Sequence, residues 1–203
     1  LIAGASSGMG RATALALATT GARLVLAARN QTALDDVAGE IARVNGRALA
    51  IPTDLTARGD VDQLVKAVIA DYGQIDAAVM TAGTNIPRRT LDELTEESWA
   101  GMLSINLTAS FNVTQAAVPY LRQRGGQLLY ISSSAAKKAD ASGVAYQATK
   151  AGLVGLANGT MEEERRHGVR TTVIFPGLTD TPLVEKRPTP TPPDVLVKAL
   201  RPE

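Results

Sequence analysis

Short apolar segments alternate with longer stretches of helical spacing along the whole chain, and this alternation most constrains the fold. The apolar segments do not place a polar residue at every second position, which is typical of strands covered on both faces. Strands are therefore expected at Leu1–Ala3, Arg23–Ala28, Arg47–Pro52, Ala77–Met80, Gln127–Ser132 and Thr171–Phe175. Helices are expected between them at Met9–Thr20, Gln31–Asn45, Arg58–Tyr72, Glu97–Gln123 and Ala145–His167.

Strand–helix–strand units joined by short loops predict a parallel sheet with helices on both faces. Because crossovers between parallel strands are right-handed, we expect a Rossmann-like, doubly wound α/β fold of three layers. No internal boundary divides residues 1–203, so the chain should form a single domain. The prolines of Leu183–Val197 predict a mobile, extended loop within that domain.

Glycines punctuate the predicted helices. They follow the expected helix ends at Gly21, Gly46, Gly73, Gly125 and Gly168, where the left-handed backbone of a helix cap is expected. In the last long helix, Ala151, Gly155 and Gly159 leave one face almost without side chains. Either the sheet or a helix of another subunit is expected to pack closely there.

Composition removes several classes of chemistry. The chain has no cysteine and one histidine, His167, which lies at an expected helix end, so no metal site, disulfide or cysteine nucleophile is expected. With 21 basic and 20 acidic residues and no basic block, nothing points to nucleic acid or a membrane surface. No apolar run approaches the roughly 20 residues of a membrane helix, and a cytoplasmic location is expected.

A glycine-rich turn joins the first expected strand to the first helix. Its spacing is G-x3-G-x-G, and at a strand–helix junction free backbone N–H groups and the positive helix end can hold a pyrophosphate. Ordinary turn glycines are the alternative. The backbone expected to surround the phosphates is Gly4, Ser6, Ser7, Gly8, Met9 and Gly10.

The second expected strand ends in Ala27-Ala28-Arg29, where NAD-binding chains carry an acidic residue for the ribose 2′-hydroxyl. Arg29 can instead bind a 2′-phosphate through its planar fork, which favours NADP; a plain surface arginine is the alternative. Asp54, after the third strand, either accepts from the adenine amino group or caps the following helix.

Tyr146 and Lys150 lie one helical turn apart in Tyr146-Gln147-Ala148-Thr149-Lys150. An ammonium nearby favours the phenolate and lowers the pKa of a tyrosine, so Tyr146 could act as acid or base on a carbonyl or alcohol. Ser132, Ser133 and Ser134 end a buried strand, at the edge of the sheet where ligands gather. One of these hydroxyls could donate to the same carbonyl oxygen, or all three could be turn serines.

Together these motifs resemble the short-chain dehydrogenase/reductase family. The glycine turn, Thr81-Ala82-Gly83, Asn106, the serine run, Tyr146-x3-Lys150 and Pro176-Gly177 occur in the family's order and spacing from the first residue to about Thr181. The resemblance implies Ser133 as the substrate-orienting serine and Tyr146 as the acid/base. It implies that Lys150 binds the nicotinamide ribose and lowers the tyrosine's pKa, and that Asn106 holds a water that relays protons.

The resemblance also implies the rest of the cofactor site. Pro176-Gly177 with Thr179 and Thr181 would contact the nicotinamide carboxamide, and Leu55 with the Ala82-Gly83 backbone would border the adenine. The family is usually tetrameric, which suits a homo-oligomer paired through the glycine-rich helix face.

Three departures from the family pattern are visible. Ala3 stands where threonine is usual and Thr81 where asparagine is usual, and the chain stops at Glu203, before the family's final helix and strand. We therefore expect the chain to be part of a protein of roughly 250 residues.

The leading hypothesis is an NADP(H)-dependent oxidoreductase that reduces a ketone, aldehyde or 3-oxoacyl-type substrate with Tyr146 as acid/base. An NAD(P)-dependent alcohol or sugar dehydrogenase working in the oxidising direction is the alternative within enzymes, and a non-catalytic dinucleotide sensor is the alternative outside them. The proline-rich loop and residues 84–89 and 137–144 should close the substrate pocket. Their basic residues Arg88, Arg89, Lys137 and Lys138 could bind an anionic carrier or acid, but they are expected to be solvated surface groups.

Overall fold

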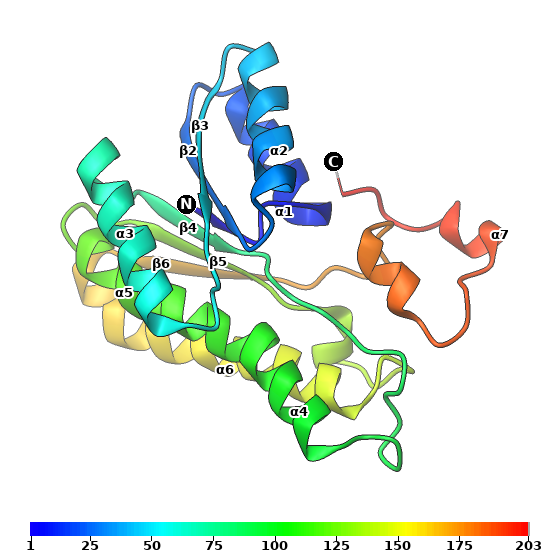
Figure 1. The fold of residues 1–203 in the computed structure, drawn as a ribbon. Coiled ribbons are helices and arrows are strands. Elements are labelled where there is room, and N and C mark those ends of the chain that lie inside the picture. Colours follow the sequence, from blue (N-terminus) through cyan, green and yellow to red (C-terminus); the bar gives the residue numbers. More distant parts are fainter. Residues whose placement is uncertain (203) are drawn as a thin grey trace.

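Six parallel strands form one sheet in the order β3-β2-β1-β4-β5-β6 (Figure 1). The structure is a computed structural model and describes residues 1–202. The strands are β1 Ile2–Ala3, β2 Arg23–Ala28, β3 Arg47–Pro52, β4 Ala77–Met80, β5 Gln127–Ile131 and β6 Arg170–Ile174. The order reverses direction between β1 and β4, where Ile2 pairs with both Leu26 and Val79. This order confirms the doubly wound fold and places a ligand crevice above β1 and β4.

Helices cover both faces of the sheet. They are α1 Gly8–Ala18, α2 Gln31–Arg43, α3 Arg58–Tyr72, α4 Glu96–Leu103, α5 Ala109–Leu121, α6 Val144–Glu164 and α7 Pro193–Leu196. Helices α1 and α2 lie on one face, with Leu34 and Ile41 in their core. Helices α3, α5 and α6 lie on the other, with Val113 and Leu153 in theirs (Figure 1). The three-layer prediction is confirmed.

The expected single helix Glu97–Gln123 is interrupted. A π-helical turn, Ser104–Thr108, separates α4 from α5 and carries Asn106 into the interior, where its side chain is completely buried. Such turns insert one extra residue, and here the amide of Asn106 is held by backbone groups of Thr84. Periodicity could not reveal the break, because the apolar spacing continues on both sides of it.

The glycine prediction is wrong at one helix end. Gly21, Gly73, Gly125 and Gly168 have positive φ, but after α2 the left-handed residue is Asn45, at φ 58°. Gly46 is required for packing instead, because a Cβ there would lie 2.7 Å from the Ile41 side chain. Asparagine tolerates the left-handed region better than other side chains do, which explains the exchange.

Two further expectations change in the C-terminal quarter. Strand β6 is the last strand of the described sheet, and along it exposed residues alternate with partly buried ones. Leu183–Val197 is not extended throughout, because the 3₁₀ helix Pro182–Lys186 and α7 occupy much of it. Prolines in the first turn suit both helices, since a first-turn N–H has no intrahelical partner.

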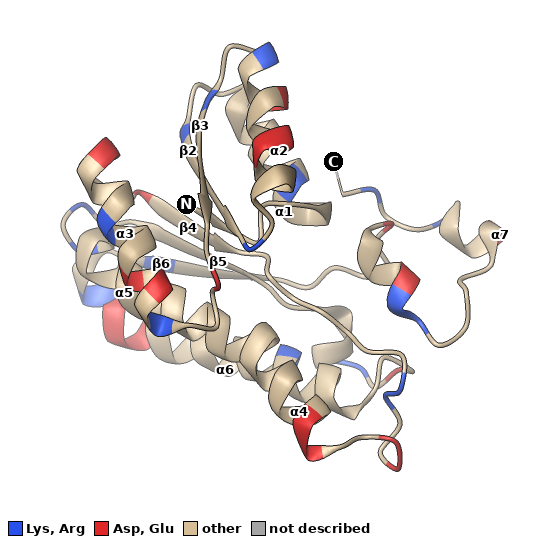
Figure 2. Ribbon diagram, viewed as in Figure 1, with Lys and Arg blue, Asp and Glu red and all other residues tan. Residues whose placement is uncertain are grey.

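Charged side chains of both signs are interspersed over the helices (Figure 2). Within residues 1–202, no helix is long and apolar enough to cross a membrane.

Candidate active site

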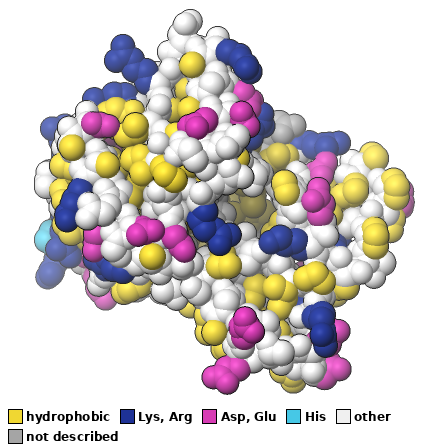
Figure 3. Space-filling view, viewed as in Figure 1, with side chains coloured by type: hydrophobic (Ala, Val, Ile, Leu, Met, Phe, Trp, Pro, Cys, Tyr) yellow, Lys and Arg dark blue, Asp and Glu magenta, His cyan; other side chains and the backbone are white. Residues whose placement is uncertain are grey.

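Two adjoining cavities open at the carboxyl ends of the strands. The glycine-turn cavity, about 480 Å³, is bordered by Gly4–Gly10, the end of β2 and Ala82-Gly83. The Tyr146 cavity, about 510 Å³, is bordered by Ser133, Tyr146, Pro176-Gly177 and the start of the C-terminal segment. Met9, Thr181 and Leu183 line both. Figure 3 shows this face of the molecule hollowed between the α1–α2 lobe and the C-terminal segment, with basic side chains around the opening.

The glycines of the turn are needed for backbone to pack against backbone. Gly4 has φ +96°, and a Cβ on it would lie 2.5 Å from the Ala82 nitrogen. A Cβ on Gly10 would lie 2.2 Å from the Gly4 carbonyl oxygen. Ordinary turn glycines do not need neighbouring backbone to be this close. The close approach of the backbone packs the turn against the loop after β4.

The amino end of α1 is open towards the glycine-turn cavity. Ser7 precedes the helix but its side chain makes no capping hydrogen bond, and the first intrahelical bond runs from the Arg11 N–H to the Ser7 carbonyl at 3.1 Å. The N–H groups at Gly8, Met9 and Gly10 therefore have no intrahelical acceptor. An anion suits this position, so the residues fit a dinucleotide pyrophosphate.

Thr81 explains one departure from the family pattern. Its hydroxyl lies 2.9 Å from the Ala3 carbonyl oxygen and 3.1 Å from that of Gly4, so it can bridge the end of β1 and the glycine turn. Its backbone N–H also donates to Ala3 at 2.9 Å. A threonine can thus brace the turn from the position where the family usually carries asparagine.

The edge of the glycine-turn cavity next to β2 carries Arg29 and Asp54. Arg29 is exposed, and it is one of the smaller causes that keep the pKa of Asp54 low, although no ion pair joins the two. The largest cause is the Thr56 side chain, which donates to Asp54 Oδ1 at 2.7 Å, followed by the Thr56 N–H at 2.9 Å. Asp54 does not cap α3, whose N-cap is Ala57.

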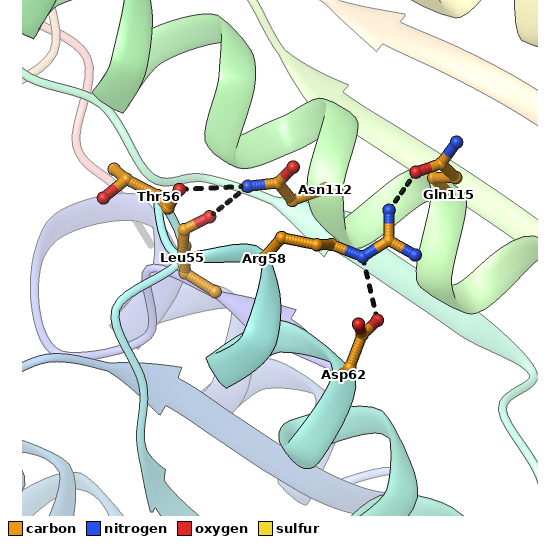
Figure 4. Close-up of polar contacts among 6 residues, drawn as sticks. All are labelled: Leu55, Thr56, Arg58, Asp62, Asn112 and Gln115. Atoms are coloured by element: carbon orange, nitrogen blue, oxygen red, sulfur yellow. Dashed lines mark hydrogen bonds and ion pairs between the residues drawn. The ribbon is translucent and has the colours of Figure 1, made fainter.

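Asn112 is a residue that sequence reasoning missed. From α5 its buried amide donates to the carbonyl oxygens of Leu55 at 3.1 Å and Thr56 at 3.3 Å (Figure 4). Nearby, Arg58 binds Asp62 and Gln115, which ties the start of α3 to α5 (Figure 4). Asn112 fixes the wall that contains Leu55. A buried asparagine inside an apolar helix was the available signal.

The three serines after β5 separate into different environments. Ser132 is buried and donates to the Lys150 carbonyl at 2.7 Å, which anchors α6 on the sheet. Ser133 is half-buried, lines the Tyr146 cavity, and accepts a bond from the Ala135 N–H at 3.2 Å. Ser134 is exposed and begins a 3₁₀ turn. The Ser133 hydroxyl also opposes part of the rise that burial causes in the pKa of Tyr146.

The protein by itself does not lower the pKa of Tyr146. Burial of the phenol raises it, the Ser133 hydroxyl opposes that shift, Asp140 adds to it and Arg89 opposes it weakly. Lys150 is not among these causes, because its ammonium lies 5.7 Å from the ring centroid and donates to the Ile131 carbonyl at 2.8 Å. In this arrangement of side chains Lys150 therefore does not contribute the expected lowering of the Tyr146 pKa.

Lys150 and Asn106 lie behind the cavities rather than on their walls. Lys150 is fully buried, and desolvation lowers the pKa of its amine to about 8. Asn106 donates to the Thr149 hydroxyl at 3.1 Å and accepts from the Thr84 N–H at 2.7 Å. A Cβ on Gly83 would lie 3.3 Å from Lys150 Nζ and 3.6 Å from Asn106 Oδ1, so the two polar groups meet under Gly83.

The remaining predicted positions also border the cavities. Pro176, Gly177, Thr179 and Thr181 line the Tyr146 cavity, and the Pro176 carbonyl accepts from the Ser134 N–H at 2.9 Å. Thr181 faces the turn closely enough that a Cβ on Gly8 would lie 3.3 Å from its side chain. Every predicted cofactor residue except Lys150 therefore lines one of the two cavities.

One basic residue of the pocket loops is not on the surface. Arg88 is exposed as expected, but Arg89 is only 7% exposed and lines the Tyr146 cavity. The expectation of a solvated Arg89 is therefore wrong.

With this geometry, comparison with known proteins is informative. The family model for short chain dehydrogenases matches residues 1–191. The chain belongs to the short-chain dehydrogenase family. It is 38% identical over 188 residues to an uncharacterized oxidoreductase of Listeria monocytogenes, which covers 91% of this chain and 75% of that protein. It is 34% identical over 190 residues to a 3-oxoacyl-(acyl-carrier-protein) reductase of Thermotoga maritima, covering 93% and 76% of the two chains.

Solved structures agree on the fold. An alcohol dehydrogenase from the archaeon Thermococcus sibiricus, complexed with 5-hydroxy-NADP, superposes with a TM-score of 0.88 at 29% identity, over 99% of this chain and 85% of the other. Levodione reductase superposes with a TM-score of 0.87 at 29% identity, over 91% and 72% of the two chains. This short-chain dehydrogenase is therefore an oxidoreductase of the nicotinamide-dependent type.

Proposed function

We propose that this short-chain dehydrogenase reduces a ketone or aldehyde to an alcohol with NADPH, with Tyr146 as the proton donor. The observation that carries the proposal is the meeting of the two cavities. Ser133 and Tyr146 line one, the open end of α1 lines the other, and Met9 and Thr181 border both. A substrate and a dinucleotide could then be in contact while each is held by its own wall.

The chain's own groups supply the proton chemistry. NADP supplies the hydride when it is bound in reduced form. The Tyr146 phenol gives its proton to the carbonyl oxygen, and the Ser133 hydroxyl donates a hydrogen bond to the same oxygen. Burial raises the pKa of Tyr146, so the phenol is protonated at neutral pH, as a proton donor must be.

We assign the remaining predicted residues to supporting roles. Lys150 binds the nicotinamide ribose and replaces the proton of Tyr146, with Asn106 positioned behind it. Pro176, Gly177, Thr179 and Thr181 contact the nicotinamide. The segment 183–197 forms one wall of the substrate site, since Leu183, Val184 and Arg187 line the Tyr146 cavity.

Replacement of Tyr146 tests the acid/base role. Tyr146→Phe should lower kcat on a panel of ketones by about 100-fold or more while the Kd for NADPH changes little. Tyr120→Phe is the matched control, because this tyrosine of α5 lines neither cavity. A loss smaller than tenfold with binding intact would reject the role. NADPH binding by wild type without turnover of any carbonyl compound would favour a dinucleotide sensor instead.

The choice of NADP over NAD rests on Arg29. Its exposed guanidinium borders the glycine-turn cavity, and a relative of the same fold is complexed with 5-hydroxy-NADP. Arg29→Asp should lower the NADP/NAD ratio of kcat/KM by at least about tenfold, whereas Arg43→Asp, at the far end of α2, should leave it unchanged. An unchanged ratio in Arg29→Asp would reject the phosphate role.

An oxidative alcohol or sugar dehydrogenase remains the second candidate. It is favoured by the structural likeness to an alcohol dehydrogenase. Initial rates with NADP and a panel of secondary alcohols and aldoses, measured beside NADPH and the matching carbonyl compounds, separate the two directions.

Pairing of α6 between subunits is proposed for the assembly. Ala151, Gly155 and Gly159 are exposed, and no atom lies within 4 Å of a Cβ added at either glycine, so the sheet is excluded as the partner of this face. Light scattering is expected to give a tetramer, and a monomer would reject the pairing. The cytoplasmic location stays a prediction.

A further inference from the structure

Arg89 is a buried cation whose charge is not neutralised by the protein. Within residues 1–202 no ion pair includes it, and its Nε has no hydrogen-bond partner. Its Nη2 donates to the Lys186 carbonyl at 2.6 Å. Arginines this deeply buried are normally paired with a carboxylate, because an unpaired buried charge costs several kcal/mol.

The charged groups near Arg89 do not balance its positive charge. Burial lowers the pKa of its guanidinium most, Arg187 lowers it further, and Asp140 and Tyr146 raise it. Asp140 lies beyond ion-pair distance, and its Oδ1 accepts from the Ser142 N–H at 2.8 Å. The wall around Arg89 therefore holds two cations against one carboxylate that pairs with neither.

The packing around Arg89 fixes its side chain in the wall of the Tyr146 cavity. Gly143 has φ +94°, and a Cβ on it would lie 2.8 Å from both the Arg89 Cβ and its carbonyl oxygen. The loop before α6 therefore lies directly on Arg89, and the Lys186 carbonyl holds it from the C-terminal segment. Arg88, one residue earlier, points to solvent with 81% of its side chain exposed.

A second unsatisfied polar group lies in the same wall. The Ser142 hydroxyl is buried and has no hydrogen-bond partner within residues 1–202. Ser142, Arg89 and Arg187 all line the Tyr146 cavity, together with Ser133. A hydroxyl and two guanidiniums that converge on one cavity are the groups that bind an oxoanion.

We propose that Arg89, with Arg187 and Ser142, binds a carboxylate of the substrate, so that the compound reduced beside Tyr146 is an oxo acid. The proposal rests on the proposed function and names its substrate class. A carboxylate is favoured over a larger anion because the Arg89 side chain is confined by Gly143 on one side and by the Lys186 carbonyl on another. A phosphoester is also an oxoanion, so the experiment must distinguish a substrate carboxylate from a substrate phosphate.

The experiment compares each anionic ketone with its neutral counterpart in the NADPH-bound enzyme. The pairs are 4-oxopentanoate with its methyl ester, and dihydroxyacetone phosphate with dihydroxyacetone. Wild type should prefer 4-oxopentanoate over the ester by about 30-fold in kcat/KM, which is typical of one charge-assisted pair. Arg89→Met should remove most of that preference, Arg89→Lys should keep part of it, and Arg88→Met should leave it unchanged.

The ratio of kcat/KM for the acid to that for the ester distinguishes carboxylate binding by Arg89 from a purely structural role. If Arg89 only braced the two loops, Arg89→Met would lower the rates on the acid and the ester equally, and the proposal would be overturned. A preference for dihydroxyacetone phosphate over both carboxylate and neutral ketones would overturn the carboxylate assignment in favour of a phosphoester.

Binding separates this proposal from the proposed function. If wild type reduces no ketone, calorimetry with 4-hydroxypentanoate and NADP decides. Binding to wild type and Arg88→Met that is lost in Arg89→Met supports the anion site although the reductase assignment fails. Absence of binding to wild type overturns the anion site, and turnover of neutral ketones alone overturns it while the reductase assignment stands.

Discussion

The two cavities are built in different ways. In the glycine-turn cavity the turn packs backbone against backbone, and Thr81 and Asn112, the polar side chains that brace its walls, have their hydrogen bonds made. Around the Tyr146 cavity the walls are side chains from loops far apart in the sequence, and Arg89 Nε and Ser142 Oγ are left without partners. The difference indicates that the side chains shaping the first site have their partners already and leave only the backbone N–H groups of α1 open, whereas the second site has two side-chain groups without partners.

The largest expected effect breaks the backbone wall. In Gly10→Ala the new Cβ would lie 2.2 Å from the Gly4 carbonyl oxygen, which forces the turn and α1 apart. We expect loss of nucleotide binding, seen as loss of thermal stabilisation by NADPH, and destabilisation of about 2 kcal/mol or more. Gly39→Ala in α2 is the control, because nothing lies within 4 Å of its added Cβ and alanine favours a helix by up to about 1 kcal/mol. Retained NADPH binding in Gly10→Ala would contradict the backbone account.

The glycine turn is also where the sequence was most informative. Gly4, Gly8 and Gly10 lie close together along the chain, so their spacing alone predicts the geometry of the turn. The same holds for the strand order, since the βαβ handedness leaves few arrangements. The break at Ser104–Thr108 was hidden, because it depends on Asn106 meeting the backbone of Thr84, a contact that periodicity cannot encode.

The second prediction concerns the buried amine behind the Tyr146 cavity. Desolvation lowers the pKa of Lys150 to about 8, below the value of about 10.5 in an unfolded chain. Between these values the unfolded state binds more protons, so this lysine makes the folded protein more stable as pH rises. Without nucleotide, the stability of wild type relative to Lys150→Met should rise between about pH 7 and about pH 10, by up to roughly 3 kcal/mol. Denaturant unfolding at both pH values measures it, and a constant difference would contradict it.

The third prediction addresses the fixed wall near Leu55. Asn112→Leu removes the two hydrogen bonds to Leu55 and Thr56 and leaves their carbonyl groups unpaired, at a cost of about 2 kcal/mol. The KM for NADPH should rise several-fold, while the choice among carbonyl substrates should not change. Gln123→Leu, two residues past the end of α5 and exposed, is the control and should alter neither. A change in substrate preference would mean that the two cavities are not built independently.

The Tyr146 cavity was the less predictable of the two for a physical reason. Arg88 and Arg89 are neighbours with the same local sequence, and only the packing of Gly143 and Lys186 makes one buried and the other exposed. The pKa of Tyr146 likewise depends on its burial and on Asp140, neither of which follows from the Tyr–Lys spacing. Contacts between loops about 50 and 100 residues apart decide this site, and a local pattern does not encode them.

The smallest expected effect is the difference in stability between removing a hydroxyl that has a hydrogen-bond partner and removing one that has none. Ser142→Ala removes a buried hydroxyl that has no partner, so the free protein should be equally stable or more stable by up to about 1 kcal/mol. Ser132→Ala removes a hydroxyl that donates to the Lys150 carbonyl at 2.7 Å and should cost about 1–2 kcal/mol. Thermal unfolding of both variants without ligand gives the difference. If Ser142→Ala were as destabilising as Ser132→Ala, the Ser142 hydroxyl would be hydrogen-bonded in the folded protein. The contrast between the satisfied side chains of the glycine-turn cavity and the unsatisfied ones of the Tyr146 cavity would then fail.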